Sequence, residues 1–226
     1  MNEIFSYPIP SKKDITFFRR KIISWFKKNG RYYPWREEKD PYKILIAELM
    51  LRRTKADQVV PVYKKFLKEF PHVEILANAN QCTIDEILYP LGLKWRNSSF
   101  IKMARELVEK FNSKVPDNKK ELKSLPGVGD YVAGAILLFA YGKKEWVVDN
   151  NIVRIFKRYF DIKTSKEARR NKHVIKMAKF YFSGKDIKKA FMGILDITAL
   201  ICKPRKPLCE KCVLNIKCKF INNLET

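Results

Sequence analysis

Four cysteines lie within 17 residues near the end of the chain: Cys202, Cys209, Cys212 and Cys218. Their spacing is C-x6-C-x2-C-x5-C, and the fifth cysteine, Cys82, lies far from them in the sequence. Four thiolates this closely spaced can converge on one metal centre. The N-terminus lacks the apolar stretch of an export signal, so metal ligation is favoured over disulfides. Zinc sites with four cysteines usually show two C-x2-C pairs, whereas this sequence has one.

The second chemically informative feature is a turn between a basic and an apolar segment. It consists of Leu125, Pro126, Gly127, Val128 and Gly129. Both glycines permit positive φ and let the backbone approach a partner closely. Backbone N–H groups there, with the start of the next helix, can bind an anion such as a phosphate. The turn can equally be a plain connection that requires glycine. Flanking lysines, and Asp149 placed 20 residues after Gly129, favour phosphate binding.

Charge points to a polyanionic partner. Lys and Arg number 47 and Asp and Glu 24, which gives a net charge of +23 in 226 residues. Nucleic acid is the expected partner, because heat adaptation usually raises Glu together with Lys. The basic residues are spread along the chain, which disfavours a membrane surface. The longest apolar run, residues 132–141, is too short to span a bilayer, so a cytoplasmic, nucleoid-associated protein is expected.

Apolar residues recur with the period of a helix, and no convincing period-two alternation occurs. Helices are expected at residues 14–28, 42–53, 56–70, 98–111, 118–124, 130–141, 149–159, 165–182 and 186–201. Thr83 and Glu86 form a capping-box pattern that predicts the start of a further short helix. The sequence therefore predicts an all-α fold with short loops, large enough for one large or two small domains.

Three segments carry a resemblance to a known family. Residues 125–158, LPGVGDYVAGAILLFAYGKKEWVVDNNIVRIFKR, resemble the helix–hairpin–helix and catalytic-aspartate segment of the endonuclease III superfamily of DNA glycosylases. The cysteine spacing is similar to that family's [4Fe–4S] cluster loop, here residues 202–218. Residues 32–59, YYPWREEKDPYKILIAELMLRRTKADQV, resemble the N-terminal segment of adenine-mismatch and archaeal thymine-mismatch glycosylases.

The resemblance implies two helical lobes with a DNA cleft between them. One lobe is a helical barrel at residues 35–143 that ends with the helix–hairpin–helix. The other is discontinuous, combining residues 1–34 and 144–226, and holds the cluster loop. The cluster is expected to be structural, folding a basic loop against DNA phosphates.

The resemblance also implies that Asp149 is the catalytic carboxylate. Breaking an N-glycosidic bond builds positive charge on the sugar, and a nearby carboxylate stabilises that charge and orients water. Asp149 can equally cap a helix. The Gly-Pro pair usual before this aspartate is missing, but the Val-Asp-x-x-h-x-Arg pattern around it is retained. Tyr131 stands where bifunctional members carry the lysine that forms a Schiff base, which implies a monofunctional enzyme. Its alternative role is packing.

Glu48 interrupts an otherwise apolar segment, and the resemblance implies that it donates a proton or hydrogen bond to the departing base. The alternative is a buried partner for Arg52 or Arg53. This arginine pair resembles the thymine-mismatch branch, since the adenine enzymes carry glutamines there. Arg53 is expected to fill the gap left by the flipped base and to contact the orphan guanine. Both arginines can instead bind phosphates or remain solvated.

The resemblance therefore implies a monofunctional, monomeric glycosylase that removes thymine or uracil opposite guanine in duplex DNA and carries a [4Fe–4S] cluster. The alternatives are an adenine glycosylase acting opposite oxidised guanine, a glycosylase for another damaged base, a bifunctional lyase and an inactive DNA-binding module. Adenine enzymes usually carry an additional C-terminal domain, whereas this sequence stops eight residues after Cys218. The missing lysine at position 131 disfavours the lyase.

Overall fold

The computed structural model describes residues 10–92, 94–164 and 167–223, and every regular element in these ranges is helical. The predicted all-α class is therefore confirmed for this part of the chain. Contacts divide the protein into two compact units, Tyr32–Glu145 on the one hand and Met1–Arg31 with Trp146–Thr226 on the other. We call them the middle unit and the terminal unit. No helix in the described ranges is long and apolar enough to cross a membrane.

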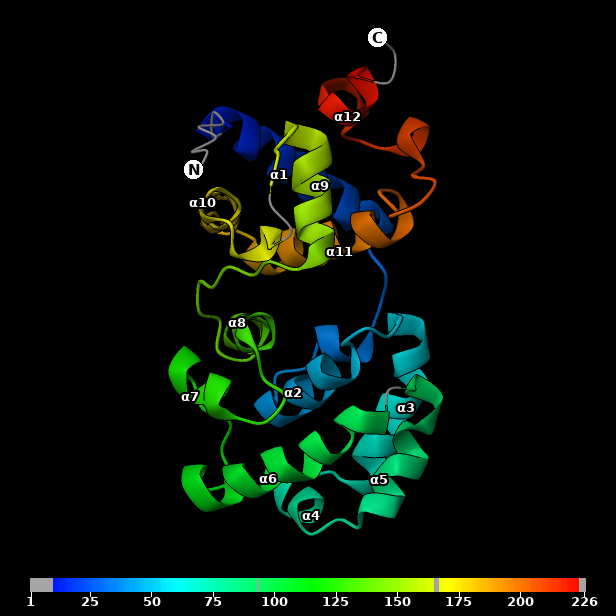
Figure 1. Cartoon of the computed structure of the whole chain (residues 1–226), viewed down its shortest axis with the longest axis vertical. Helices are drawn as coiled ribbons and strands as arrows, with labels where there is room; N and C mark the ends of the chain where they lie inside the picture. The colour runs from blue at the N-terminus through cyan, green and yellow to red at the C-terminus, as the bar shows by residue number, and fades with distance from the viewer. Residues whose placement is uncertain (1–9, 93, 165–166, 224–226) are drawn as a thin grey trace, which may run out of the picture. The chain divides into compact units, whose positions relative to one another are not determined.

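The terminal unit is built from both ends of the chain (Figure 1). Its helices are α1 (Lys12–Asn29), α9 (Asn150–Phe160), α10 (Lys172–Tyr181), α11 (Ile187–Leu200) and α12 (Lys219–Asn222), with short 3-10 turns η4 (Ala168–Arg170), η5 (Cys209–Lys211) and η6 (Asn215–Lys217). Helix α1 packs on α11 and α10, while α9 packs on α11 and α12. A Cβ at Gly193 would lie 2.8 Å from Ile22 Cγ2, so glycine permits the close approach of α11 to α1.

An aromatic cluster forms the core of the terminal unit. Phe18 of α1 is fully buried, and its ring centroid lies 4.7 Å from that of Tyr159 and 5.1 Å from that of Phe160 on α9. Tyr181 of α10 completes the contact at 5.7 Å. Such large buried rings dominate core energetics, so they fix α9, which carries Asp149 at its start.

The middle unit surrounds one apolar helix. Its elements are η1 (Pro34–Arg36), α2 (Pro41–Met50), α3 (Ala56–Glu69), α4 (Val73–Ala77), α5 (Gln81–Leu88), η2 (Tyr89–Leu91), η3 (Lys94–Arg96), α6 (Ser98–Phe111), α7 (Lys119–Ser124) and α8 (Asp130–Phe139). Eight of the ten residues of α2 are buried, as expected of a helix that is apolar on all sides. Helix α2 packs on α8 and α3, and α7 packs on α8.

Three local predictions from the sequence were wrong. The capping box at Thr83 and Glu86 does not start a helix, because α5 already begins at Gln81, where Asn80 Oδ1 accepts a hydrogen bond of 2.8 Å from the Cys82 amide. Helix α2 ends at Met50 instead of residue 53, because Arg53 adopts a left-handed conformation with φ +60°. In the region predicted as helix 165–182, α10 begins at Lys172. Residues 165–166 lie outside the described ranges.

Candidate functional site

Asp149 occupies the N-cap of α9, as its alternative reading allowed. Its Oδ1 accepts a hydrogen bond of 2.7 Å from the Ile152 amide, and its Oδ2 accepts one of 2.7 Å from Asn151 Nδ2. Capping explains why this short polar residue begins the helix. Because each carboxylate oxygen offers two acceptor positions, both oxygens keep capacity for a water molecule. The capping role therefore does not exclude a chemical one.

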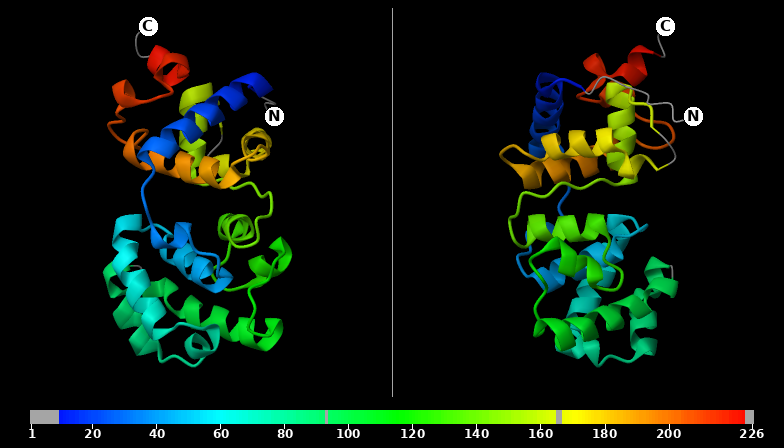
Figure 2. Two further views of the ribbon diagram at one scale, coloured as in Figure 1. Left: turned by 180° about the vertical axis from the view of Figure 1, so that it is seen from behind. Right: turned by 60° about the vertical axis from the view of Figure 1, so that its left-hand side comes forward.

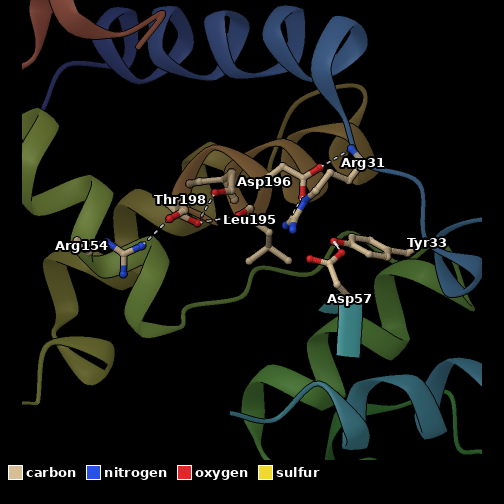
Figure 3. Close-up of polar contacts among 8 residues, drawn as sticks. Arg31, Tyr33, Asp57, Arg154, Leu195, Asp196 and Thr198 are labelled. Atoms are coloured by element: carbon tan, nitrogen blue, oxygen red, sulfur yellow. Dashed lines mark hydrogen bonds and ion pairs between the residues drawn. The ribbon is translucent and has the colours of Figure 1, made fainter. Parts of the chain in front are cut away.

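A hydrogen-bonded path leads from Asp149 to the cysteine loop, residues 202–218. Arg154 Nη1 donates to Asn151 Oδ1 at 2.9 Å, and Asn151 in turn holds Asp149. The same guanidinium donates from Nε to the Cys202 carbonyl at 2.9 Å. Its Nη2 donates to the Thr198 carbonyl, also at 2.9 Å (Figure 3). Burial lowers the pKa of Arg154, whereas Cys202 and Asp149 act in the opposite direction. One side chain thus spans α9, α11 and the loop.

Arg158, one turn further along α9, holds the cysteine loop directly. Its Nη1 donates to the Lys203 carbonyl at 2.6 Å and lies 3.4 Å from Cys202 Sγ, while Nη2 donates to the Pro204 carbonyl at 2.9 Å. Its guanidinium also lies over the Phe220 ring of α12 at 4.8 Å from the centroid. Figure 2 shows the loop and α12, coloured orange to red, beside α9 within the terminal unit.

The four loop cysteines line one cavity and form no disulfide. The remaining lining is mostly apolar, with Ile155, Tyr159, Leu214 and Phe220 among its residues. The pKa of Cys212 is raised to about 11, mainly by burial and also by the neighbouring cysteine thiolates, while a hydrogen bond from the Leu214 amide acts in the opposite direction. A bound metal would reverse this effect, because a coordinating thiol is deprotonated outright.

The donor set suits an iron–sulfur cluster better than a single zinc ion. In the described ranges, no three His, Cys, Asp or Glu side chains are grouped to hold one metal ion. Zinc would require four sulfurs each about 2.3 Å from a common centre. In a [4Fe–4S] cluster each cysteine binds a different iron, so the four sulfurs stand further apart around a larger body. Four thiols around an otherwise apolar cavity fit such a group.

The terminal unit also contains a polar anchor that the sequence reading missed. Asp196 on α11 is fully buried, and its Oδ1 accepts from Arg31 Nη2 at 2.9 Å and from Nε at 3.1 Å (Figure 3). Its Oδ2 accepts from the Arg31 amide at 2.9 Å. A buried carboxylate held by three hydrogen bonds fixes the chain where α1 has ended. The signal was a lone acid in the apolar segment AFMGILDITAL, of the same kind that singled out Glu48.

The predicted phosphate-binding turn, residues 125–129, lies in the middle unit between α7 and α8. We call it the LPGVG turn. Gly127 has φ +85°, and a Cβ there would lie 3.2 Å from Ser99 Oγ and 3.3 Å from Leu49 Cδ2. Gly129 differs from the prediction, since its φ is −101° and nothing lies within 4 Å of a Cβ built on it. Leu125 and Val128 are buried, which leaves their backbone as the means of contact with a ligand.

Charges near the LPGVG turn are mixed. Gly129 is the N-cap of α8, and the first backbone N–H groups of a helix have no partner within the helix. Asp130 begins α8, and its Oδ1 pairs with Lys123 Nζ at 2.8 Å. This ion pair offsets a carboxylate that would otherwise repel an anion from the helix N-terminus. Exposed Lys120 contributes further positive charge on α7, whereas the half-buried Lys119 is paired with Glu145 Oε2 at 2.8 Å.

Arg52 and Arg53 lie in the turn that follows α2, residues 51–54, which we call the arginine turn. Arg52 Nη1 donates to the Gly127 carbonyl at 3.1 Å, so the arginine turn is bonded to the LPGVG turn. Arg53 is exposed. The two neighbours therefore differ, because Arg52 is engaged with the protein and Arg53 points to solvent.

Glu48 and Tyr131 lie on the two packed helices of the middle unit. Glu48 on α2 has only 6% of its surface exposed, and Tyr131 in the first turn of α8 is half-buried. Because α2 packs on α8, the structure brings both helices and both turns together in one unit. Asp149 belongs to the terminal unit. The roles of all three residues in chemistry stay predictions.

Comparison with known proteins identifies the family. Residues 46–179, more than half of the chain, match the family described as HhH-GPD superfamily base excision DNA repair protein. The chain belongs to the HhH-GPD superfamily. This match confirms the resemblance noted from the three sequence segments, and it covers the arginine turn, the LPGVG turn and Asp149.

Relatives match the HhH-GPD chain along nearly its whole length. A thymine-DNA glycosylase of Aeropyrum pernix is 37% identical over 94% of this chain and 97% of its own. A thymine/uracil-DNA glycosylase of Pyrobaculum aerophilum is 37% identical over 96% and 97%. An adenine DNA glycosylase of Buchnera aphidicola is 35% identical over 91% of this chain but 59% of its own length.

Solved structures share the fold of this HhH-GPD protein. A thermostable thymine-DNA glycosylase superposes with a TM-score of 0.85 at 32% identity, over 93% of this chain and 98% of that one. An endonuclease III trapped as a covalent intermediate with DNA superposes with a TM-score of 0.80 over 96% of this chain and all of that one. The second protein is 19% identical and therefore supports the fold alone.

Proposed function

We propose that this chain is a monofunctional DNA glycosylase of base excision repair that removes thymine or uracil mispaired with guanine from duplex DNA. The observation that carries the proposal is a partly solvated carboxylate, Asp149, held at the start of a helix in a member of a base excision superfamily. It is supported by thymine and thymine/uracil glycosylases that are 37% identical over nearly the whole chain.

In the proposed reaction the mispaired nucleotide leaves the base stack, which costs less for a mismatch than for a matched pair. Positive charge develops on the sugar as the base departs, and the Asp149 carboxylate stabilises it. The same group orients a water molecule for attack on the anomeric carbon. Asn151 and the Ile152 amide hold the carboxylate in a fixed position without filling its acceptor sites. The products are a free base and an abasic site.

Two residues of the middle unit refine this mechanism. Tyr131 occupies the place of the lysine in bifunctional relatives, and a phenol cannot form an imine with the sugar. This supports hydrolysis without strand cleavage. Glu48 is a buried carboxyl group in the apolar helix α2. Such a group can donate a hydrogen bond or proton to the departing base.

The cofactor proposed for the cysteine loop is a [4Fe–4S] cluster held by Cys202, Cys209, Cys212 and Cys218. A bound cluster would cross-link the loop, which is the structural role proposed for it. Arg154 and Arg158 join that loop to α9, so an ordered loop supports the position of the helix that begins at Asp149. Basic residues of the loop are then available to contact phosphates.

A panel of labelled duplexes tests the function. We expect product from G·T and G·U pairs, and strand breaks that appear only after alkali treatment. Duplexes with adenine opposite oxidised guanine, or with oxidised pyrimidines, should remain intact. Cleavage without alkali, or an adduct trapped by borohydride, would contradict the role assigned to Tyr131. If product formed only from the duplex with adenine opposite oxidised guanine, the protein would instead be an adenine glycosylase.

Substitution of the two glycines of the LPGVG turn should separate folding from binding. Alanine at position 127 must adopt φ +85° close to Ser99 and Leu49, which costs about 1–2 kcal/mol of stability. Alanine at position 129 keeps an ordinary φ in open space, so the melting temperature should hold. Its methyl group would nevertheless keep a phosphate from the backbone, weakening duplex affinity about tenfold. Thermal unfolding and duplex titration at one salt concentration measure both effects.

The two glycine variants serve as controls for each other, because Gly127→Ala is expected to lower the melting temperature and Gly129→Ala the duplex affinity. If Gly129→Ala binds duplex as tightly as the unsubstituted protein, the LPGVG turn does not approach a phosphate through this backbone. If Gly127→Ala melts at the unchanged temperature, its positive φ is not the reason for the glycine.

A further inference from the structure

Arg96 is a buried cation that the proposed chemistry does not use. It ends η3 and has 3% of its surface exposed. Its Nη2 donates to Thr54 Oγ1 at 3.1 Å, and its Nη1 donates to the Arg52 carbonyl. Both acceptors are uncharged oxygens of the arginine turn, 42 and 44 residues away in the sequence. The two acceptors stand on either side of Arg53.

Burying the Arg96 guanidinium costs free energy. Burial lowers its pKa, and the neighbouring Arg52 guanidinium lowers it further by repulsion. A buried cation whose bonds go to neutral oxygens is expensive compared with one that faces a carboxylate. A hydrophobic residue would fill the same space without this penalty. The two-pronged hydrogen bonding of the guanidinium is therefore the property that distinguishes arginine here.

Arg53, between the two acceptors, has a strained backbone. Its φ of +60° lies in the left-handed region, which a residue with a long side chain rarely adopts. Strain of this kind persists only where the surroundings enforce it, and it gathers at functional positions. The turn itself contributes weak support, since the Thr54 amide donates to the Leu51 carbonyl at 3.3 Å. The Arg96 fork adds bonds to the residues before and after Arg53.

The arginine turn is held from the other side as well. Arg52 Nη1 donates to the Gly127 carbonyl, while Ser99 Oγ donates to the Arg96 carbonyl at 2.5 Å. The arginine turn, the LPGVG turn and η3 are thus joined by hydrogen bonds within the middle unit. The one long side chain of the arginine turn that is left exposed is that of Arg53.

We propose that Arg96 is a positioning residue for base excision, which holds Arg53 in its left-handed conformation so that Arg53 can occupy the space of the extruded base. Arg96 itself touches no DNA in this scheme. The inference rests on the proposed function, because it assigns a role in the same reaction. Its distinctive consequence is that the effect of Arg96 passes through Arg53.

Arg96→Lys tests the proposal, since lysine keeps the charge but not the two-pronged donor. Single-turnover removal of thymine from a G·T duplex should fall about tenfold, as it should for Arg53→Ala. The double variant should be no slower than Arg53→Ala alone, because the second substitution removes a function already lost. Arg105→Lys is the matched control, as Arg105 Nε bonds the Ala77 carbonyl at 3.0 Å in the same unit, away from the arginine turn.

Two further readouts separate positioning from a general loss of structure. With uracil opposite an abasic position there is no orphan guanine to contact, so the Arg96→Lys effect should shrink to less than about twofold. Amide hydrogen exchange of residues 52–54 in the DNA-free protein should accelerate at least about tenfold in Arg96→Lys and remain unchanged in Arg105→Lys.

Different results would contradict the positioning role of Arg96 and the proposed function. Additive losses in the double variant, or an equal loss on both substrates, would overturn the positioning role. Unchanged exchange at residues 52–54 would show that Arg96 does not hold the turn. If the unsubstituted protein excises neither thymine nor uracil, the proposed function fails. Hydrogen exchange then still decides whether Arg96 fixes Arg53.

Discussion

Asp149→Asn is expected to lower base excision by at least about 10³-fold while duplex binding persists, because the amide cannot carry the negative charge that stabilises the cationic sugar. The fold should be retained. Asparagine caps helices as well as aspartate does, and its Oδ1 can still accept the hydrogen bond of the Ile152 amide. The hydrogen bond from Asn151 Nδ2 to Oδ2 is lost, because the asparagine Nδ2 cannot accept it, so stability should fall by about 1 kcal/mol. Single-turnover excision, thermal unfolding and duplex affinity measure the three quantities.

Asp161→Asn is the matched control, because Asp161 ends the same helix α9 with φ +54°, a conformation that asparagine tolerates well. It should excise at the unsubstituted rate. If Asp149→Asn retained activity, the Asp149 carboxylate would not be the catalytic group. Equal losses in both variants would assign the effect to the helix and not to the charge at position 149.

The features of the site that could be predicted from the sequence are those that depend on short local sequence patterns. The N-cap at Asp149, the glycine at position 127 and the four clustered cysteines each depend on residues a few positions apart. The glycine pattern could not show that Gly129 keeps an ordinary φ, because the direction in which the chain enters α8 depends on how that helix packs. The start of α5 was misplaced for a similar reason, since Asn80 and Thr83 compete as caps.

The parts that were missed depend on contacts between distant segments. Arg96 reaches residues more than 40 positions away, and Arg154 and Arg158 reach the cysteine loop over similar separations. In a chain with 47 basic residues, three structural arginines are indistinguishable from those that face solvent or phosphate. A spacing of four residues between Arg154 and Arg158 placed them on one face of α9, but nothing local identified what that face would meet.

Removal of one proposed cluster ligand, Cys212, should have a large effect on iron content and duplex affinity. Cys212→Ala is expected to yield colourless protein, whereas the unsubstituted protein should be brown, absorb broadly in the visible range and contain about four irons per chain. Alanine is chosen because a serine oxygen can still bind iron. Helix α1 packs on α10 and α11, and Phe18 contacts Tyr159 and Tyr181, so the terminal unit should keep its aromatic core.

Without the cluster, the three remaining thiols around an apolar cavity are left to hold residues 202–218, and Arg158 faces Cys202 Sγ as a free thiol. The loop should then be cleaved readily by proteases, and duplex affinity should fall at least about tenfold, because its lysines and arginines no longer meet phosphates together. Cys82→Ser is the control, since Cys82 is an exposed free thiol of the middle unit and should change neither colour nor affinity. If the unsubstituted protein were colourless and contained one zinc per chain, the cysteine loop would hold zinc and not an iron–sulfur cluster. A Cys212→Ala protein that kept its iron would remove Cys212 from the ligand set.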